Sequence, residues 1–307
     1  MSQNIEKRNK NFAYRFNQLM GFILGARFFV VALLAFALYV STFFLFNREE
    51  SFKVFVFDYH AHLIILCSVL SILAGGIINQ FYDQEKDKVT KPFRSRIQSF
   101  LKQKYFLYAY IFLNALCLSI AFSQSWNVFI FFLVYQFLMW FYSHKLSKIL
   151  IVNNLTFVGL TMYPFFGMLV YYKTFTLKVF FMAIFLFLML MIIDMVKDLL
   201  TKNADKIFGY KTIANSFSST TARQIIITFC LLAFVVSLII IKGIGLHSIM
   251  SFYFLGGLIV LLLCVFWMLR NRKNDKLTTL SVLKFWIFVG ILAMLFDGIY
   301  NKFSWAI

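Results

Sequence analysis

The chain has 307 residues, of which 62% are hydrophobic and 20% aromatic, while only 14% are charged. So apolar a composition excludes a water-soluble globular protein and indicates a membrane protein that crosses the bilayer several times. The formal net charge of +18 would suit a nucleic-acid partner, but the cationic residues follow the pattern of membrane loops described below, so we expect no nucleic acid.

Nine apolar runs are long enough to cross a bilayer, since a spanning helix needs about 20 mostly apolar residues. They lie near 27–46, 60–80, 104–122, 126–143, 150–172, 176–196, 224–242, 247–269 and 283–301. Only two prolines occur and the runs are longer than barrel strands, so the sequence predicts an all-α, polytopic helical bundle. We expect one transmembrane domain over 27–307, preceded by a basic, aromatic segment, 1–26, that suits a cytoplasmic membrane surface.

The distribution of positive charge predicts the orientation. With the N-terminus placed inside, 24 of the 30 Lys and Arg residues fall on the inner side of nine spans and six on the outer side. This asymmetry satisfies the positive-inside rule. We therefore expect a multi-pass protein of the plasma (inner) membrane, with its N-terminus and its acidic loops in the cytoplasm.

The second expected helix runs into an acidic stretch. Asn79, Asp83 and Asp87 stand four residues apart, so on a continuous helix they share one face. Hard cations such as Mg²⁺ prefer oxygen ligands and commonly tie carboxylates to substrate phosphates. We predict that these three side chains bind Mg²⁺ and, through it, a diphosphate.

Basic residues follow this acidic face. Four cations lie within nine residues of Asp87, among them Lys91 and Arg94, and Lys145 emerges on the same side after the fourth expected helix. Arginine and lysine can close on the free oxygens of a metal-bridged polyanion. We predict Lys91, Arg94 and Lys145 as ligands of the diphosphate.

A second acidic stretch ends the sixth expected helix. Asp194, Asp198, Thr201 and Asp205 are spaced by four, three and four residues and define one helical stripe. An ionised carboxylate at mid-membrane depth costs about 2.5–3.5 kcal/mol on insertion scales, so it normally faces protein or a watery cavity. We predict all three aspartates as metal ligands. The alternative, a solvated helix end, suits Asp205 best and Asp194 least.

These residues resemble the motifs of the UbiA superfamily of intramembrane prenyltransferases, whose members carry two aspartate-rich inner loops on about nine helices. The first family motif is Asn-Asp-x-x-Asp-x-x-x-Asp, usually followed by a basic residue and proline. Its places are filled here by Asn79, Asp83, Asp87, Lys91, Pro92 and Arg94. Gln80 stands where the family has an aspartate.

The second motif fits in two registers. In one, Asp205 is followed by Gly209 and Thr212 as in the family, and Thr201 takes the place of an expected aspartate. In the other, Asp194 and Asp198 form the Asp-x-x-x-Asp pair. We favour the first register because it accounts for the glycine and the threonine, and both use the same helical face.

The resemblance implies a Mg²⁺-dependent enzyme that moves a prenyl group from a prenyl diphosphate to a lipid-soluble acceptor in the membrane. Its catalytic residues would be Asp83, Asp87, Asp198 and Asp205. The resemblance allows an aromatic quinone precursor, a glycerol phosphate lipid or another isoprenoid as the acceptor. Two alternatives remain open, a non-catalytic homologue and a carrier that binds a phosphorylated lipid without chemistry.

Overall fold

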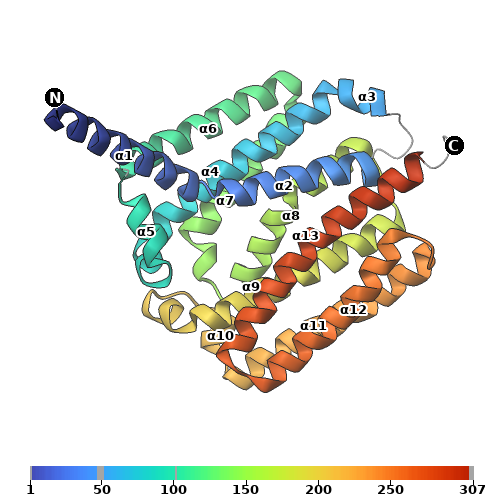
Figure 1. Cartoon of the computed structure of the whole chain (residues 1–307). Coiled ribbons are helices and arrows are strands. Elements are labelled where there is room, and N and C mark those ends of the chain that lie inside the picture. Colours follow the sequence, from blue (N-terminus) through green and yellow to red (C-terminus); the bar gives the residue numbers. More distant parts are fainter. Residues whose placement is uncertain (1, 47–51, 101, 304–307) are drawn as a thin grey trace. The chain divides into compact units, whose positions relative to one another are not determined.

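The computed structural model describes residues 2–46, 52–100 and 102–303 (Figure 1). Every element assigned within these ranges is helical, which confirms the all-α prediction. The chain separates into two compact units. The first unit comprises Met1–Phe36 and His60–Lys145, and the second comprises Ala37–Tyr59 and Leu146–Ile307.

The first unit holds the N-terminal helices. They are α1 (Ser2–Gly25), the first part of α2 (Phe28–Ser41), α4 (Tyr59–Thr90), α5 (Pro92–Gln98), α6 (Gln103–Gln124) and α7 (Trp126–His144). Helix α1 contacts α5, and α6 contacts α7. Between α1 and α2 the backbone of Arg27 adopts φ 53°, which breaks the helix at the point where the surface segment 1–26 was expected to end.

A glycine allows close packing in this unit. A Cβ atom at Gly76 of α4 would lie 3.1 Å from the carbonyl oxygen of Ala26, tighter than an ordinary contact. Small residues permit such approaches between membrane helices. The turn that carries Arg27 therefore lies against α4.

The second unit holds the rest of α2 and the C-terminal helices. They are the π-helical turn η1 (Thr42–Phe46), α3 (Phe52–Phe57), the 3₁₀ turn η2 (Leu146–Lys148), α8 (Val152–Tyr172), α9 (Leu177–Ile207), α10 (Ile213–Ser216), α11 (Ser219–Ile244), α12 (Ile249–Arg270) and α13 (Lys273–Phe303). Helix α9 contacts α8, α10, α11 and α13.

An apolar core surrounds α9. Met189 and Ile192 are fully buried there, together with Cys230 of α11 and Cys264 of α12. Because lipid is as apolar as this core, close packing of complementary shapes holds membrane helices together more than transfer from water does. The core thus fixes the helix that carries the second acidic stripe.

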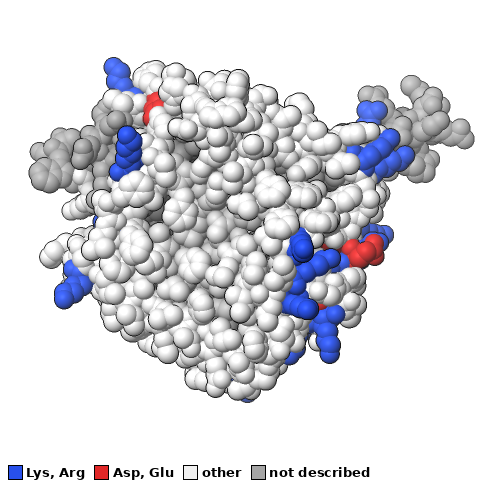
Figure 2. All heavy atoms as spheres, turned by 180° about the vertical axis from the view of Figure 1, so that it is seen from behind, with Lys and Arg blue, Asp and Glu red and all other residues white. Residues whose placement is uncertain are grey.

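Nine helices among the described residues are long and apolar enough to cross a membrane, in line with the nine predicted spans. Three of them exceed the predicted spans by about ten residues, because α4 continues to Thr90, α9 continues to Ile207 and α13 begins at Lys273. Figure 2 shows a face with broad uncharged areas between small groups of charged side chains. The extensions of α4 and α9 place both acidic stretches on helices.

Candidate functional site

The first acidic stretch lies on the last turns of α4. The Nδ2 atom of Asn79 donates a hydrogen bond to Oδ2 of Asp83 at 2.9 Å, and Lys91 Nζ lies 2.8 Å from Oδ1 of Asp87. Asp87 is buried, whereas Asn79 and Asp83 are half-buried. The structure therefore places all three predicted ligands on one continuous helix.

A group of cations gathers beside Asp87. Pro92 begins α5 immediately after Lys91, a position where the missing N–H of proline costs nothing, and the turn brings Arg94 back toward the end of α1. Arg94 Nη2 donates to the carbonyl oxygen of Leu24 at 2.6 Å.

The electrostatics of this group favour an anion. Burial lowers the pKa of Lys91, the ion pair with Asp87 opposes that shift, and the charges of Arg27 and Arg94 add to it. Burial also lowers the pKa of Arg94, again with a contribution from Arg27. The buried Nε atoms of both arginines have no hydrogen-bond partner within the described part of the chain. Three cations around one acid leave an excess of positive charge that a diphosphate could neutralise.

Lys145 lies at the end of α7, where its backbone N–H donates to Phe141 and its side chain is exposed. Its neighbour His144 contacts the ring of Tyr82 edge-on at 5.5 Å between centroids. Tyr82 directly precedes Asp83, so the end of α7 lies against the acidic part of α4.

Gln80 differs from its neighbours in the motif because its side chain is 5% exposed. A Cβ atom added at Gly25 would meet Gln80 Oε1 and the ring of Phe106, so this side chain points between α1 and α6. An ionised aspartate in that place would be desolvated, which is costly. The Oε1 atom of Gln80 is itself buried and has no hydrogen-bond partner within the described ranges.

The second acidic stretch contains a carboxylate pair joined by a side chain from another helix. Nδ2 of Asn154, on α8, donates to Oδ2 of Asp194 at 2.8 Å and to Oδ2 of Asp198 at 2.9 Å. The three residues are between 0% and 3% exposed. Lys197 completes the group, with Nζ 2.5 Å from Oδ1 of Asp194 and 3.9 Å from Oδ1 of Asp198.

Asp205 belongs to a separate pair one to two turns further along α9. Its Oδ2 accepts a hydrogen bond from Thr201 Oγ1 at 2.7 Å, and its carboxylate is fully buried. Its backbone oxygen accepts from Tyr210 N at 2.9 Å, across a turn in which Gly209 has φ +73°. The stripe therefore divides into two pairs, Asp194 with Asp198 and Thr201 with Asp205.

The oxygen-bearing side chains of the second acidic stretch suit a hard divalent cation. Within residues 2–46, 52–100 and 102–303, no three His, Cys, Asp or Glu side chains are grouped to hold a metal ion. The pair of Asp194 and Asp198 nevertheless fits Mg²⁺. Beside its two carboxylates, Oδ1 of Asn154 is a buried oxygen without a hydrogen-bond partner among those residues. Mg²⁺ is usually held by one or two carboxylates and completed by water and substrate phosphate.

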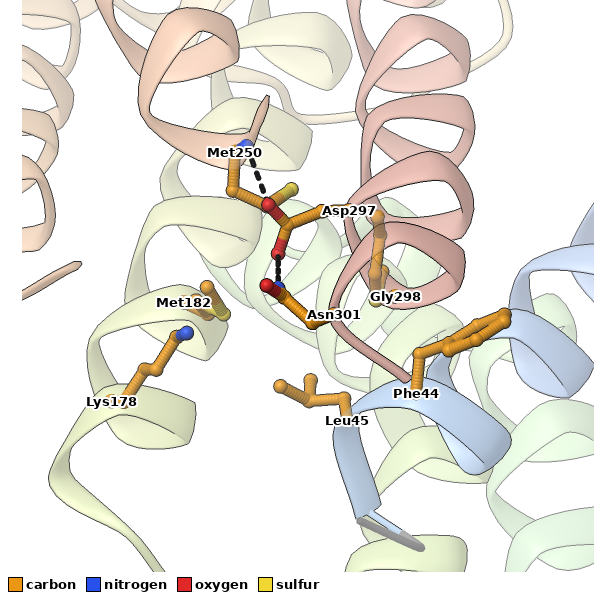
Figure 3. Close-up of a pocket in the computed structure, with 9 residues that line it drawn as sticks. Phe44, Leu45, Lys178, Met182, Met250, Asp297, Gly298 and Asn301 are labelled. Carbon is orange, nitrogen blue, oxygen red and sulfur yellow. Dashed lines mark hydrogen bonds between the residues drawn. The ribbon is translucent and has the colours of Figure 1, made fainter. Parts of the chain in front are cut away.

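A cavity of about 270 Å³ lies elsewhere in the second unit (Figure 3). Asp297 and Asn301 line it on one side and Lys178 on another. The Asp297 carboxylate accepts from Ser248 Oγ and from the backbone N–H of Met250 in the first turn of α12, so it helps to cap that helix. Lys178 precedes Asp194 by 16 residues on α9, which is about 24 Å of helix. This cavity is therefore distinct from the second acidic stretch.

Fold and site together define a multi-pass, all-α membrane protein with acidic side chains near the ends of two long helices, and with a buried carboxylate pair on one of them. The model of the UbiA prenyltransferase family matches residues 38–291, more than half of the chain. The chain therefore belongs to the UbiA prenyltransferase family, and the predicted class of membrane-embedded, prenyl-transferring enzyme is confirmed.

Relatives with assigned names agree with this membership. The digeranylgeranylglyceryl phosphate synthase of Thermococcus sibiricus is 30% identical over 188 residues, which is 60% of this chain and 66%, just under two thirds, of that protein. The protein of the same name from Thermococcus gammatolerans is 25% identical over 239 residues, covering 76% of this chain and 84% of its own.

Solved structures share the fold. A structure of digeranylgeranylglyceryl phosphate synthase superposes with a TM-score of 0.67 at 18% identity, covering 92% of this chain and 99% of the other. A UbiA homologue from Archaeoglobus fulgidus bound to GPP and Mg²⁺ gives 0.64 at 15% identity, covering 90% and 99%. At these identities the likeness establishes the fold alone.

Sequence reasoning did not single out Asn154. A signal for Asn154 was present, because it lies next to Asn153 at the start of a membrane span, where polar side chains are costly and usually functional. No spacing rule links it to Asp194, because the two residues lie on different helices.

Proposed function

We propose that this protein transfers a prenyl group from a prenyl diphosphate to the hydroxyl group of a glycerol phosphate lipid, in a reaction that requires Mg²⁺. The observation that carries the proposal is the buried pair Asp194 and Asp198, held by Asn154 near the end of a long apolar helix. Carboxylates buried on a membrane helix usually face the bundle interior and mark a functional site.

Each acidic stretch has a role in the proposal. Asn79, Asp83 and Asp87 in the first unit, and Asp194, Asp198 and Asp205 in the second, are the proposed metal ligands. A bound Mg²⁺ would stabilise the negative charge that develops on the leaving diphosphate. Lys91, Arg94 and Lys145 are proposed to bind the remaining diphosphate oxygens, and the basic group beside Asp87 supports this for the first two.

The proposed step breaks the bond between C1 of the prenyl chain and a diphosphate oxygen, which leaves with the bonding electrons. The acceptor hydroxyl oxygen bonds to C1 and gives its proton to the released diphosphate. The allylic cation that develops at C1 must be kept from water, and the apolar spans of α4 and α9 suit that requirement. Aromatic side chains, 20% of the sequence, offer further stabilisation of a cation.

The names of the relatives favour one acceptor class. Both Thermococcus proteins are digeranylgeranylglyceryl phosphate synthases, which supports a glycerol phosphate lipid over an aromatic quinone precursor. We further propose that the protein lies in the plasma membrane with its N-terminus and the basic segment after α4 in the cytoplasm. The excess of Lys and Arg on that side supports this orientation.

The test is a transfer assay on the purified protein in lipid nanodiscs. Labelled geranylgeranyl diphosphate is supplied with Mg²⁺ and either a prenylated glyceryl phosphate or 4-hydroxybenzoate, and released diphosphate and labelled lipid are measured. We expect transfer to the glyceryl phosphate, no transfer with EDTA, and at least a hundredfold loss in Asp87→Asn and Asp198→Asn. Asp58→Asn is the matched control, because Asp58 pairs with Tyr171 and Tyr172, away from both stretches.

Two results would contradict the proposal. Unchanged diphosphate release in both Asp87→Asn and Asp198→Asn would show that the acidic stretches do not act in the reaction. Exchange of a phosphorylated lipid across vesicles without any diphosphate release would identify a carrier instead.

A further inference from the structure

The amide of Asn154 organises two acids that belong to another helix. It is the third residue of α8 and is fully buried. An amide nitrogen carries two hydrogens, and here one points to Asp194 and the other to Asp198 at 2.8 and 2.9 Å. The opposite orientation of the amide would direct its oxygen at two carboxylates, so the hydrogen-bond pattern fixes which end is the nitrogen.

The two carboxylates require such a partner. They are separated by one helical turn, and their side chains are 1% and 4% exposed, so solvent screens their repulsion poorly. Asn154 contacts only their Oδ2 atoms, while both Oδ1 atoms face Lys197, whose side chain is 43% exposed. One side of the pair is therefore held by the fold, and the other side faces a cation on a flexible, accessible side chain.

The other end of the same amide is unsatisfied. Oδ1 of Asn154 is buried and has no hydrogen-bond partner in the described ranges. A buried acceptor without a partner costs free energy, so an asparagine with a purely structural role would be expected to use both ends. Together with the two carboxylates, Oδ1 of Asn154 makes this group rich in acceptor oxygens, which suits a cation rather than an anion.

We propose that Asn154 is a positioning residue for a divalent cation. It sets the spacing and direction of the Asp194 and Asp198 carboxylates, so that their Oδ1 atoms can bind the cation in place of Lys197. The proposal rests on the proposed function for the identity of the cation as Mg²⁺. It adds a residue on α8 that neither aspartate motif contains.

Removal of the amide has a specific consequence. Without it the two carboxylates lose their shared donor and turn apart, so metal affinity falls while the ligands themselves remain. Side chains that orient metal ligands typically contribute 10–100-fold to affinity. We expect a loss of this size in Asn154→Ala, and a smaller loss in Asn154→Gln, which keeps the donor but displaces it.

The test measures metal binding directly, apart from catalysis. Mn²⁺ replaces Mg²⁺ as a paramagnetic probe, and free Mn²⁺ is followed by electron paramagnetic resonance during titration of the purified full-length protein. An Asp87→Asn background limits the contribution of the first acidic stretch. Asn153→Ala is the matched control, because it removes a neighbouring buried asparagine from the same helix. We expect its Mn²⁺ affinity to stay within about threefold of the background protein.

Several results would decide against the proposed role of Asn154 or against the proposed function. Unchanged Mn²⁺ affinity in folded Asn154→Ala, or an equal loss in Asn153→Ala, would overturn the proposal. If Asn154→Ala does not fold, Asn154→Gln carries the comparison, and unchanged affinity there would overturn it as well. Mn²⁺ binding that depends on Asn154 in a protein that transfers no prenyl group would refute the proposed function and leave this inference standing.

Discussion

Asp198→Asn should stabilise the metal-free protein while abolishing its activity. Asp194 and Asp198 accept hydrogen bonds from one nitrogen at 2.8 and 2.9 Å. Oxygens that share a donor in this way lie about 4–5.5 Å apart, for which Coulomb's law gives about 3–4 kcal/mol of repulsion at an effective dielectric constant of about 20. The substitution removes this repulsion and keeps the shape of the side chain.

Two losses reduce the gain. The hydrogen bond from Asn154 becomes a neutral one, which costs about 1 kcal/mol. The attraction to Lys197, 3.9 Å away and 43% exposed, is screened by solvent and contributes at most about 1 kcal/mol. The net stabilisation is therefore about 1–2 kcal/mol, which corresponds to a rise in melting temperature of about 2–4 °C.

Thermal unfolding in detergent with EDTA measures this effect, and the transfer assay measures activity on the same samples. Asp198→Ala is the comparison, because it leaves one hydrogen of the Asn154 amide without an acceptor and should lower the melting temperature. A melting temperature of Asp198→Asn below that of the unchanged protein in EDTA would refute the reasoning, because it would mean that the carboxylate pair stabilises the fold without metal.

Three further substitutions test the surroundings of the acidic stretches, each by thermal unfolding. Gln80→Asp introduces the family residue at a buried position, where a carboxylate is costly to desolvate. We expect a lower melting temperature and no rise in activity, and a gain in activity would contradict our interpretation of this position. Gly76→Ala should destabilise by about 1–3 kcal/mol, because its Cβ would lie 3.1 Å from the Ala26 oxygen; an unchanged melting temperature would mean that the helices can separate. Thr201→Asp should destabilise by removing the hydroxyl donor to Asp205 and adding a like charge, whereas Thr201→Ser should not.

Local periodicity was sufficient to predict the arrangement within one helix. The four-residue spacing of Asn79, Asp83 and Asp87 placed them on one face, and they lie on the single helix α4. The ends of α4 and α9 were placed too early, because an apolar run stops at the first charges. Helix propensity does not stop there, since Gln, Glu, Lys and Asp continue a helix outside the membrane at little cost.

Contacts between helices could not be predicted in this way. Asn154 lies 40 residues before Asp194, and only the packing of α8 on α9 brings the two together. The left-handed turn at Arg27 likewise depends on the approach of that turn to α4, which sequence spacing does not report. A single chain without aligned relatives carries no signal for such pairs.

The length of α9 has a consequence for substrate choice. From Leu177 to Asp194 the helix rises by about 25 Å, most of the roughly 30 Å of a hydrocarbon layer. A diphosphate headgroup bound at the acidic end would stay at the level of the lipid phosphates. Its prenyl tail could then extend along the apolar side chains of α9 toward the opposite leaflet. The length of α9 would then limit the length of the prenyl chain. Bulky substitutions closer to its N-terminal end should shorten the longest prenyl diphosphate that the protein can use.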